Sequence, residues 1–190
     1  MISRALKAAA LVLASMLVLT ACGGDSTDDS DPSTEEDAMY CELIDPQTVE
    51  PIVGSNEIKD FGGPVAKTDT RTIKCNLYDA DKREDRMAVY EYEVSSQALP
   101  KERDEVSAAM AKHTQEDTDH YVALDADGDD LGYAWFTGDT AAANLLTDTR
   151  KISVTAPATA DQAATYVPIV LKVAQEIDRN LEAWDAEHTS

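Results

Sequence analysis

The clearest periodic pattern lies near the C-terminal end of the chain, where apolar residues recur every three or four positions. The stripe consists of Ala163, Val167, Val170, Leu171, Ala174, Ile177, Leu181 and Trp184. This spacing puts all of them on one side of a helix, so it predicts an amphipathic helix over residues 160–184. Thr159 and Gln162 have the spacing of a capping box at its start. Because Pro168 has no amide proton, we expect a kink or a restart near Thr165.

Alternation of apolar and polar residues predicts β-strands in the middle of the chain. Residues 73–78 and 87–94 alternate in this way, and the charged segment 79–86 between them is expected to be a hairpin loop. Further strands are expected at 120–124, at 132–137 and as a final pair within 142–155. Half-buried strands of this kind are typical of an antiparallel sheet.

Two shorter helices complete the pattern. Asp45 and Pro46 begin the first, as a capping aspartate and a proline at the first helical position, and it ends near Gly54. The second covers residues 100–113, and residues 54–72 show little periodicity and are expected to form a loop. The predicted fold is α+β, in the order α-β-β-α-β-β-β-α. It has a mostly antiparallel sheet of about five strands with the helices packed on one face and one disulfide.

The first 22 residues follow a different pattern. Arg4 and Lys7 precede an apolar run, residues 8–18, that is too short for a permanent membrane span. A charged start, a short apolar stretch and small residues are typical of a signal peptide, here residues 1–21. The segment Leu19-Thr20-Ala21-Cys22 resembles the bacterial lipobox. The resemblance implies cleavage before Cys22 and acylation of that cysteine, with palmitate among the acyl groups. The alternative is a plain secretory signal with a chance cysteine.

Acidic residues dominate the chain that follows. The whole sequence has 37 Asp and Glu against 16 Lys and Arg, a net charge of −21, and two of its basic residues, Arg4 and Lys7, lie in the expected signal peptide. Residues 22–39 are expected to be the lipid anchor and an acidic disordered tether, 40–185 a single α+β domain, and 186–190 a frayed tail. Nucleic acid repels so acidic a chain, so no nucleic-acid partner is expected. Contact with the membrane is expected through lipid on Cys22, at the outer face of the cytoplasmic membrane.

The other two cysteines indicate the compartment. Cys41 and Cys75 remain as the single possible pair in an exported protein, where disulfides form and persist. The expected disulfide would stabilise the fold by about 3–4 kcal/mol. The alternatives are free thiols or a redox pair, although the spacing is unlike Cys-x-x-Cys.

Several short segments together carry a family resemblance. They are Cys41-Glu42-Leu43-Ile44, Cys75-Asn76-Leu77-Tyr78 and Asp127-Gly128-Asp129-Asp130-Leu131-Gly132. With the lipobox, the acidic tether and the terminal helix, residues 40–184 resemble the small actinobacterial cell-envelope lipoproteins of unknown function. They are also similar to the extracellular sensor domains of actinobacterial serine/threonine kinases. The resemblance implies a two-cysteine α+β domain that binds a ligand or a partner.

No motif for catalysis, a cofactor or a metal is found. An EF-hand loop beginning at Asp125 would need glycine at its sixth position and glutamate at its twelfth, where the chain has Asp130 and Phe136. An ordinary acidic turn and weak calcium binding by clustered carboxylates remain the two interpretations of residues 125–130. The three histidines, His113, His120 and His188, lack a visible set of further zinc ligands. We therefore expect no metal, no cofactor and no enzyme activity.

One candidate binding face follows from the strand alternation. If the neighbouring apolar residues face the core, a second sheet face carries Tyr121, Tyr133, Trp135, Glu91 and Glu93. An aromatic and acidic face without a helix over it would suit a sugar-containing or cationic ligand, or a partner protein. The alternative is that the strand phase is inverted and Trp135 belongs to the core.

Two functional interpretations follow for an extracytoplasmic lipoprotein. The first is a binding or sensing module at the cell envelope, for a small ligand or an envelope protein. The second is an accessory or structural lipoprotein that docks onto a membrane or wall complex, and an envelope hydrolase is a distant third.

Overall fold

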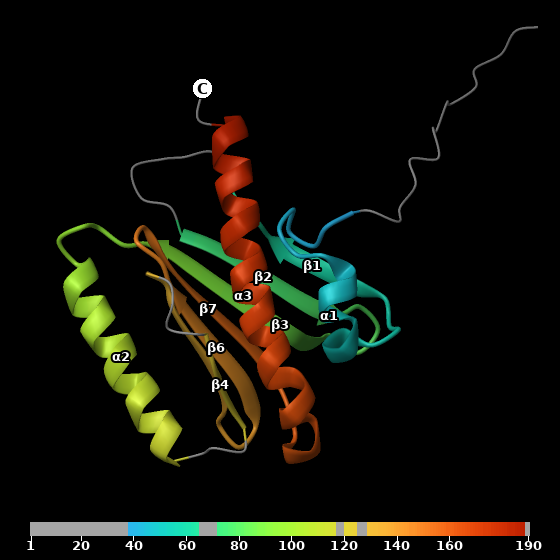
Figure 1. Cartoon of the computed structure of the whole chain (residues 1–190). Coiled ribbons are helices and arrows are strands. Elements are labelled where there is room, and N and C mark those ends of the chain that lie inside the picture. Colours follow the sequence, from blue (N-terminus) through green and yellow to red (C-terminus); the bar gives the residue numbers. More distant parts are fainter. Residues whose placement is uncertain (1–37, 65–71, 117–119, 125–128, 189–190) are drawn as a thin grey trace, which may run out of the picture. The chain divides into compact units, whose positions relative to one another are not determined.

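The structure is a computed structural model that describes residues 38–64, 72–116, 120–124 and 129–188. In the described residues, a seven-stranded antiparallel sheet and three helices form one α+β unit in the order α-β-β-β-α-β-β-β-β-α (Figure 1). The predicted α+β class and antiparallel sheet are confirmed, with seven strands instead of about five.

The helices and strands lie close to their predicted positions, with one additional strand before residue 72. The helices are α1 (Pro46–Val53), α2 (Leu99–Glu116) and α3 (Ala160–His188). The strands are β1 (Ile58–Gly62), β2 (Thr72–Asp79), β3 (Glu84–Glu93), β4 (Tyr121–Ala123), β5 (Leu131–Phe136), β6 (Thr140–Leu146) and β7 (Arg150–Pro157). Across the sheet the order is β1-β2-β3-β7-β6-β5-β4. None of the helices in the described part of the chain combines the length and the apolar character needed to cross a membrane.

Strand β1 lies in the segment that the sequence predicts to be a loop. It pairs with β2 at the edge of the sheet, and every residue in it except Ile58 is exposed. An exposed edge strand needs no alternation of apolar residues, which is why the pattern gave no sign of it. Gly62 is required at its end, because φ is +116° and a Cβ atom there would lie 1.8 Å from the carbonyl oxygen of Lys74.

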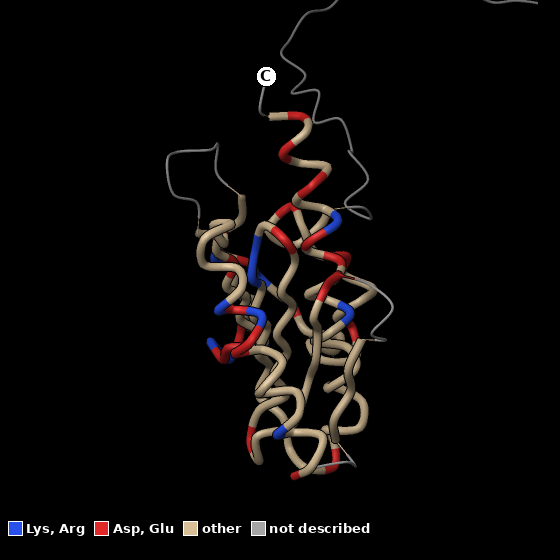
Figure 2. Tube along the Cα trace, turned by 60° about the vertical axis from the view of Figure 1, so that its left-hand side comes forward, with Lys and Arg blue, Asp and Glu red and all other residues tan. Residues whose placement is uncertain are grey.

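Helices α1 and α3 cover one face of the sheet and enclose the main core. Asp45 caps α1 by accepting the Gln47 N–H at 2.8 Å, and Gln162 caps α3 by accepting the Thr159 N–H at 2.9 Å. Helix α3 is continuous through Pro168, so the expected restart near Thr165 does not occur. Figure 2 shows acidic residues along the C-terminal part of α3.

Helix α2 lies on the opposite face, which corrects the prediction that all helices pack on one side. Its Val106 packs with Tyr133 and Leu146, whereas the alternate strand residues Ala134 and Leu145 belong to the core under α3. Strands β6 and β7 pass between the two helices in Figure 1. The sequence of β6 agrees with this packing, because its residues form a nearly unbroken buried run. A strand that is covered on both faces does not alternate between apolar and polar residues.

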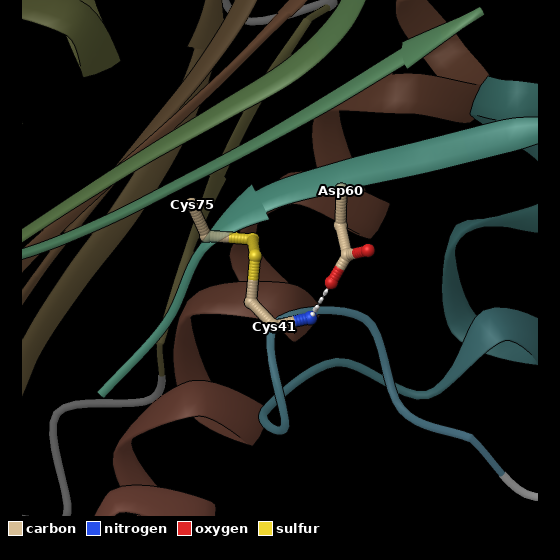
Figure 3. The surroundings of a disulfide bond; sticks show 3 residues. All are labelled: Cys41, Asp60 and Cys75. Carbon is tan, nitrogen blue, oxygen red and sulfur yellow. Dashed lines mark hydrogen bonds between the residues drawn. A yellow bond between two sulfur atoms is a disulfide. The ribbon is translucent and has the colours of Figure 1, made fainter. Parts of the chain in front are cut away.

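The expected disulfide is confirmed and fixes the segment before α1 to the sheet. Cys41 is bonded to Cys75 of β2, with Cα atoms 6.0 Å apart and a sequence separation of 34. Figure 3 shows that the backbone N–H of Cys41 also donates a hydrogen bond to the carboxylate of Asp60 in β1. Both contacts hold the start of the domain against the β1–β2 edge.

Candidate binding face

The three aromatic residues predicted to share a face do come together, but under α2. Tyr133 and Trp135 stack with centroids 4.9 Å apart, and Tyr121 lies 6.3 Å from Tyr133. His113 of α2 stacks on Trp135 at 4.7 Å. We call these four residues the covered aromatic cluster. Tyr133 is only 4% exposed and the other three side chains are half-buried, so this cluster belongs to a second small core and is not a free surface.

Glu91 and Glu93 lie on the other side of the sheet from the covered aromatic cluster, which corrects the predicted phase of β3. Glu91 is 1% exposed and shares the α3 side with Met87 and Val89. Glu93 has the same orientation by alternation, lies opposite Arg150 and is exposed. The phase was predicted wrongly because Glu91 was expected to face solvent, and burial is uncommon for glutamate.

The same correction brings the tyrosines of β3 to the surface. Tyr90 and Tyr92 are 45% and 37% exposed and lie on the α2 side, beyond the part of the sheet that α2 covers. The neighbouring strands add Phe61, Lys74, Lys151 and Ser153 on the same side by their pairing register. We call these six residues the open face. The alternation within residues 87–93 was the sequence signal that could have identified this face. It did not show which set of alternate residues faces the core.

Each exposed tyrosine of the open face has a lysine beside its ring. The Nζ atom of Lys74 in β2 lies 5.8 Å from the centre of the Tyr90 ring. The Nζ atom of Lys151 in β7 lies 5.9 Å from the centre of the Tyr92 ring. Cations at these distances over a ring are weakly attracted to its face. The two Tyr–Lys pairs follow one another along β3, one on each side of the strand.

The two lysines differ in their other partners. Lys151 donates to the carboxylate of Glu102 in α2 at 2.8 Å, whereas no described carboxylate forms an ion pair with Lys74. Burial lowers the pKa of Lys151, but Glu102 and Tyr92 outweigh burial and leave its pKa above the usual 10.5. Lys151 is therefore positively charged at neutral pH but already paired with Glu102, so Lys74 is the lysine available to a ligand.

A chain of polar side chains links the open face to the covered aromatic cluster. Ser153, which lies opposite Tyr90, donates to Asn144 at 2.7 Å, and Asn144 donates to the hydroxyl of Tyr133 at 3.2 Å. Burial raises the pKa of the Tyr133 hydroxyl, so it stays protonated at neutral pH. The centre of the face can therefore hydrogen-bond a polar ligand without any charged group of its own.

A separate pocket of about 610 Å³ lies between the start of α1 and α3. Its charged groups include Lys172 and Arg179 together with Asp45 and Glu176. The Glu176 carboxylate accepts the backbone N–H of Asp45 at 2.6 Å, so it holds α1 against α3. Because its charges are mixed and partly used in packing, this pocket indicates no ligand class.

The remaining chemistry of the described residues is sparse. Within the described ranges no three His, Cys, Asp or Glu side chains are grouped so that they could hold a metal ion. Residues 125–128 of the acidic loop, and Cys22, lie outside the described residues. Comparison of the chain with protein-family models, with curated proteins and with solved structures finds no match.

Proposed function

We propose that this chain is a membrane-anchored extracytoplasmic lipoprotein that acts as a binding or sensing module at the cell envelope. The open face is its proposed binding surface. The observation that supports this most is the exposure of Tyr90 and Tyr92 beside lysines on a rigid sheet. Exposed aromatic side chains that gather on one face are typical of interaction surfaces.

The proposed location is the outer face of the cytoplasmic membrane, with lipid on Cys22 as the anchor. The disulfide between Cys41 and Cys75 supports an extracytoplasmic location, because disulfides persist in oxidising compartments. The same two cysteines and their flanking residues support the proposal that the chain is one of the small actinobacterial cell-envelope lipoproteins.

The anchor is tested by comparing the wild-type chain with Cys22→Ala in cells fed labelled palmitate. We expect label and membrane fractionation for the wild type, and neither for the variant, because the thiol that would carry the lipid is gone. The Cys41→Ala/Cys75→Ala variant is the matched control and should still be labelled. Equal labelling of Cys22→Ala would disprove lipidation at this residue.

Binding by the open face is tested with insoluble cell-wall material and the detergent-solubilised full chain. We expect the wild type to sediment with the wall and Tyr90→Ala/Tyr92→Ala to remain in solution. Lys172→Ala, a substitution on α3 on the other side of the sheet, should behave as the wild type. If the tyrosine variant, folded by circular dichroism, sediments as well as the wild type, the open face is not the binding surface.

An accessory role in a protein complex is the second candidate. It is favoured by β1, an edge strand on which Phe61 is 74% exposed. Edge strands offer unpaired backbone groups to a partner strand. Crosslinking in cells that enriches one protein with the wild type and with Tyr90→Ala/Tyr92→Ala, but not with Phe61→Ser, would favour this role over ligand binding by the tyrosines.

A further inference from the structure

The charge of the open face is opposite in sign to that of the whole chain. The sequence has 37 acidic and 16 basic residues, yet the six residues of the open face include Lys74 and Lys151 and no acid. Among the described residues, the carboxylate that forms an ion pair with a lysine of the open face is that of Glu102 in α2, which is paired with Lys151. In so acidic a protein, this local excess of positive charge selects for an anionic ligand.

The open face also repeats one structural unit. Tyr90 with Lys74, and Tyr92 with Lys151, have nearly the same ring-to-ammonium distances of 5.8 and 5.9 Å. The two tyrosines are two residues apart on β3, so their side chains stand about 7 Å apart in a row on one side. A row of two tyrosines on one side of the sheet suits an extended ligand with successive rings, and an acid group of that ligand would pair with Lys74, because Lys151 is already paired with Glu102.

Building on the proposed function, we propose that the open face binds a linear anionic polysaccharide of the envelope, whose sugar rings carry carboxylates. Sugar rings stack on Tyr90 and Tyr92, as apolar ring faces do on aromatic side chains. A carboxylate pairs with Lys74, and the Ser153 hydroxyl oxygen, whose proton is donated to Asn144, accepts a hydrogen bond from a sugar hydroxyl. An acidic protein segment would satisfy the lysines but would leave the tyrosine rings without flat partners.

The test uses calorimetric titration of the detergent-solubilised full chain with three probes. Polygalacturonate has both rings and carboxylates, its methyl ester has rings without charge, and poly-glutamate has charge without rings. We expect binding to polygalacturonate alone, weakened as the salt concentration rises. We expect about fivefold weaker binding for Lys74→Gln and about tenfold for Tyr90→Ala/Tyr92→Ala. Lys172→Gln, which removes a lysine outside the open face, should have no effect.

Three outcomes would overturn the inference. Equal binding of poly-glutamate would assign the face to acidic protein segments, and equal binding of the methyl ester would remove the role of Lys74. Absence of binding to polygalacturonate would reject this ligand class. In that case the proposed function still stands if sedimentation with wall material depends on Tyr90 and Tyr92, so the two failures are distinguishable.

Discussion

The carboxylate of Asp79 organises the turn between β2 and β3, although no sequence motif marks it. It is 1% exposed and accepts backbone N–H groups of Asp81 and Lys82 at 3.1 and 3.0 Å. Its second oxygen accepts from Asn56 at 2.8 Å and from the guanidinium of Arg86 at 3.0 Å. The backbone N–H of Lys82, with further help from Arg86 and Asp81, outweighs burial and lowers the pKa of Asp79 below 3.8.

Substitution Asp79→Asn should therefore lower the stability of the folded chain in a pH-dependent way. Because the pKa is lower in the folded chain than in the unfolded chain, ionised Asp79 stabilises the fold fully above pH 3.8. That contribution is lost as the pH falls from 3.8 through the lower folded pKa. Urea unfolding should show wild type and variant far apart at pH 7 and converging toward pH 2. A gap that stays constant with pH would show that the charge of Asp79 is unimportant.

At the scale of elements, the disulfide attaches the segment before α1 to the sheet. Substituting both Cys41 and Cys75 by alanine should lower the free energy of unfolding by about 3–4 kcal/mol, because the 34-residue loop is no longer closed in the unfolded chain. Urea denaturation measures the difference. Reduction of the wild type should reproduce the value of the double variant, and a double variant as stable as the oxidised chain would contradict the prediction.

Helix α2 is the most weakly attached of the three helices in the described chain. Val106 is its single buried residue, and its other attachments include the ion pairs of Arg103 with Asp148 at 2.8 Å and of Glu102 with Lys151 at 2.8 Å. The Arg103–Asp148 pair is largely exposed and contributes little, so the half-buried Glu102–Lys151 pair is the stronger of the two. We therefore expect α2 to detach from the sheet before the rest of the fold unfolds.

The fluorescence of Trp135 reports on this detachment in a Trp184→Phe background, since the chain has two tryptophans. Val106→Ala should lower the stability of the α2 contact by about 1.5 kcal/mol. The emission of Trp135 should then shift to the red at urea concentrations where circular dichroism is still native. Val173→Ala, a control of equal size in α3, should shift both signals together. Coincident transitions in Val106→Ala would refute a separate α2 step.

How far the sequence predicts each element depends on how the element is buried. Helix α3 was predicted closely because a helix that buries one stripe shows that stripe in its spacing. Strand β1 was missed because it buries almost nothing. The phase of β3 was inverted because Tyr90 and Tyr92 look like core residues while Glu91 is the buried one. The binding face depended on that phase, so it emerged only when the pairing register was known.

At the scale of the whole molecule, the excess of acids opposes folding through self-repulsion. Near the C-terminal part of α3, the pKa values of Asp130 and Asp178 are raised, mainly by burial and to a smaller extent by neighbouring carboxylates. The charge of Asp148 raises the pKa of Asp130 further, while Arg150 partly offsets the effect at Asp178. Ionised carboxylates in such places destabilise the compact state, and the chain tolerates them because they keep its surface strongly charged.

Asp130→Asn should therefore stabilise the fold at neutral pH. A carboxyl whose pKa is higher in the folded chain than its reference 3.8 is harder to ionise there, so removing its charge raises the free energy of unfolding at pH 7. The gain should disappear at pH 3 and below, because the carboxyl becomes protonated in both states. Added salt should reduce the share of this stability gain that comes from repulsion by Asp148, but not the share that comes from burial of Asp130. Urea unfolding at both pH values, with and without salt, separates these contributions. A variant less stable than the wild type at pH 7 would mean that the attraction of Asp130 to Arg103 outweighs both costs.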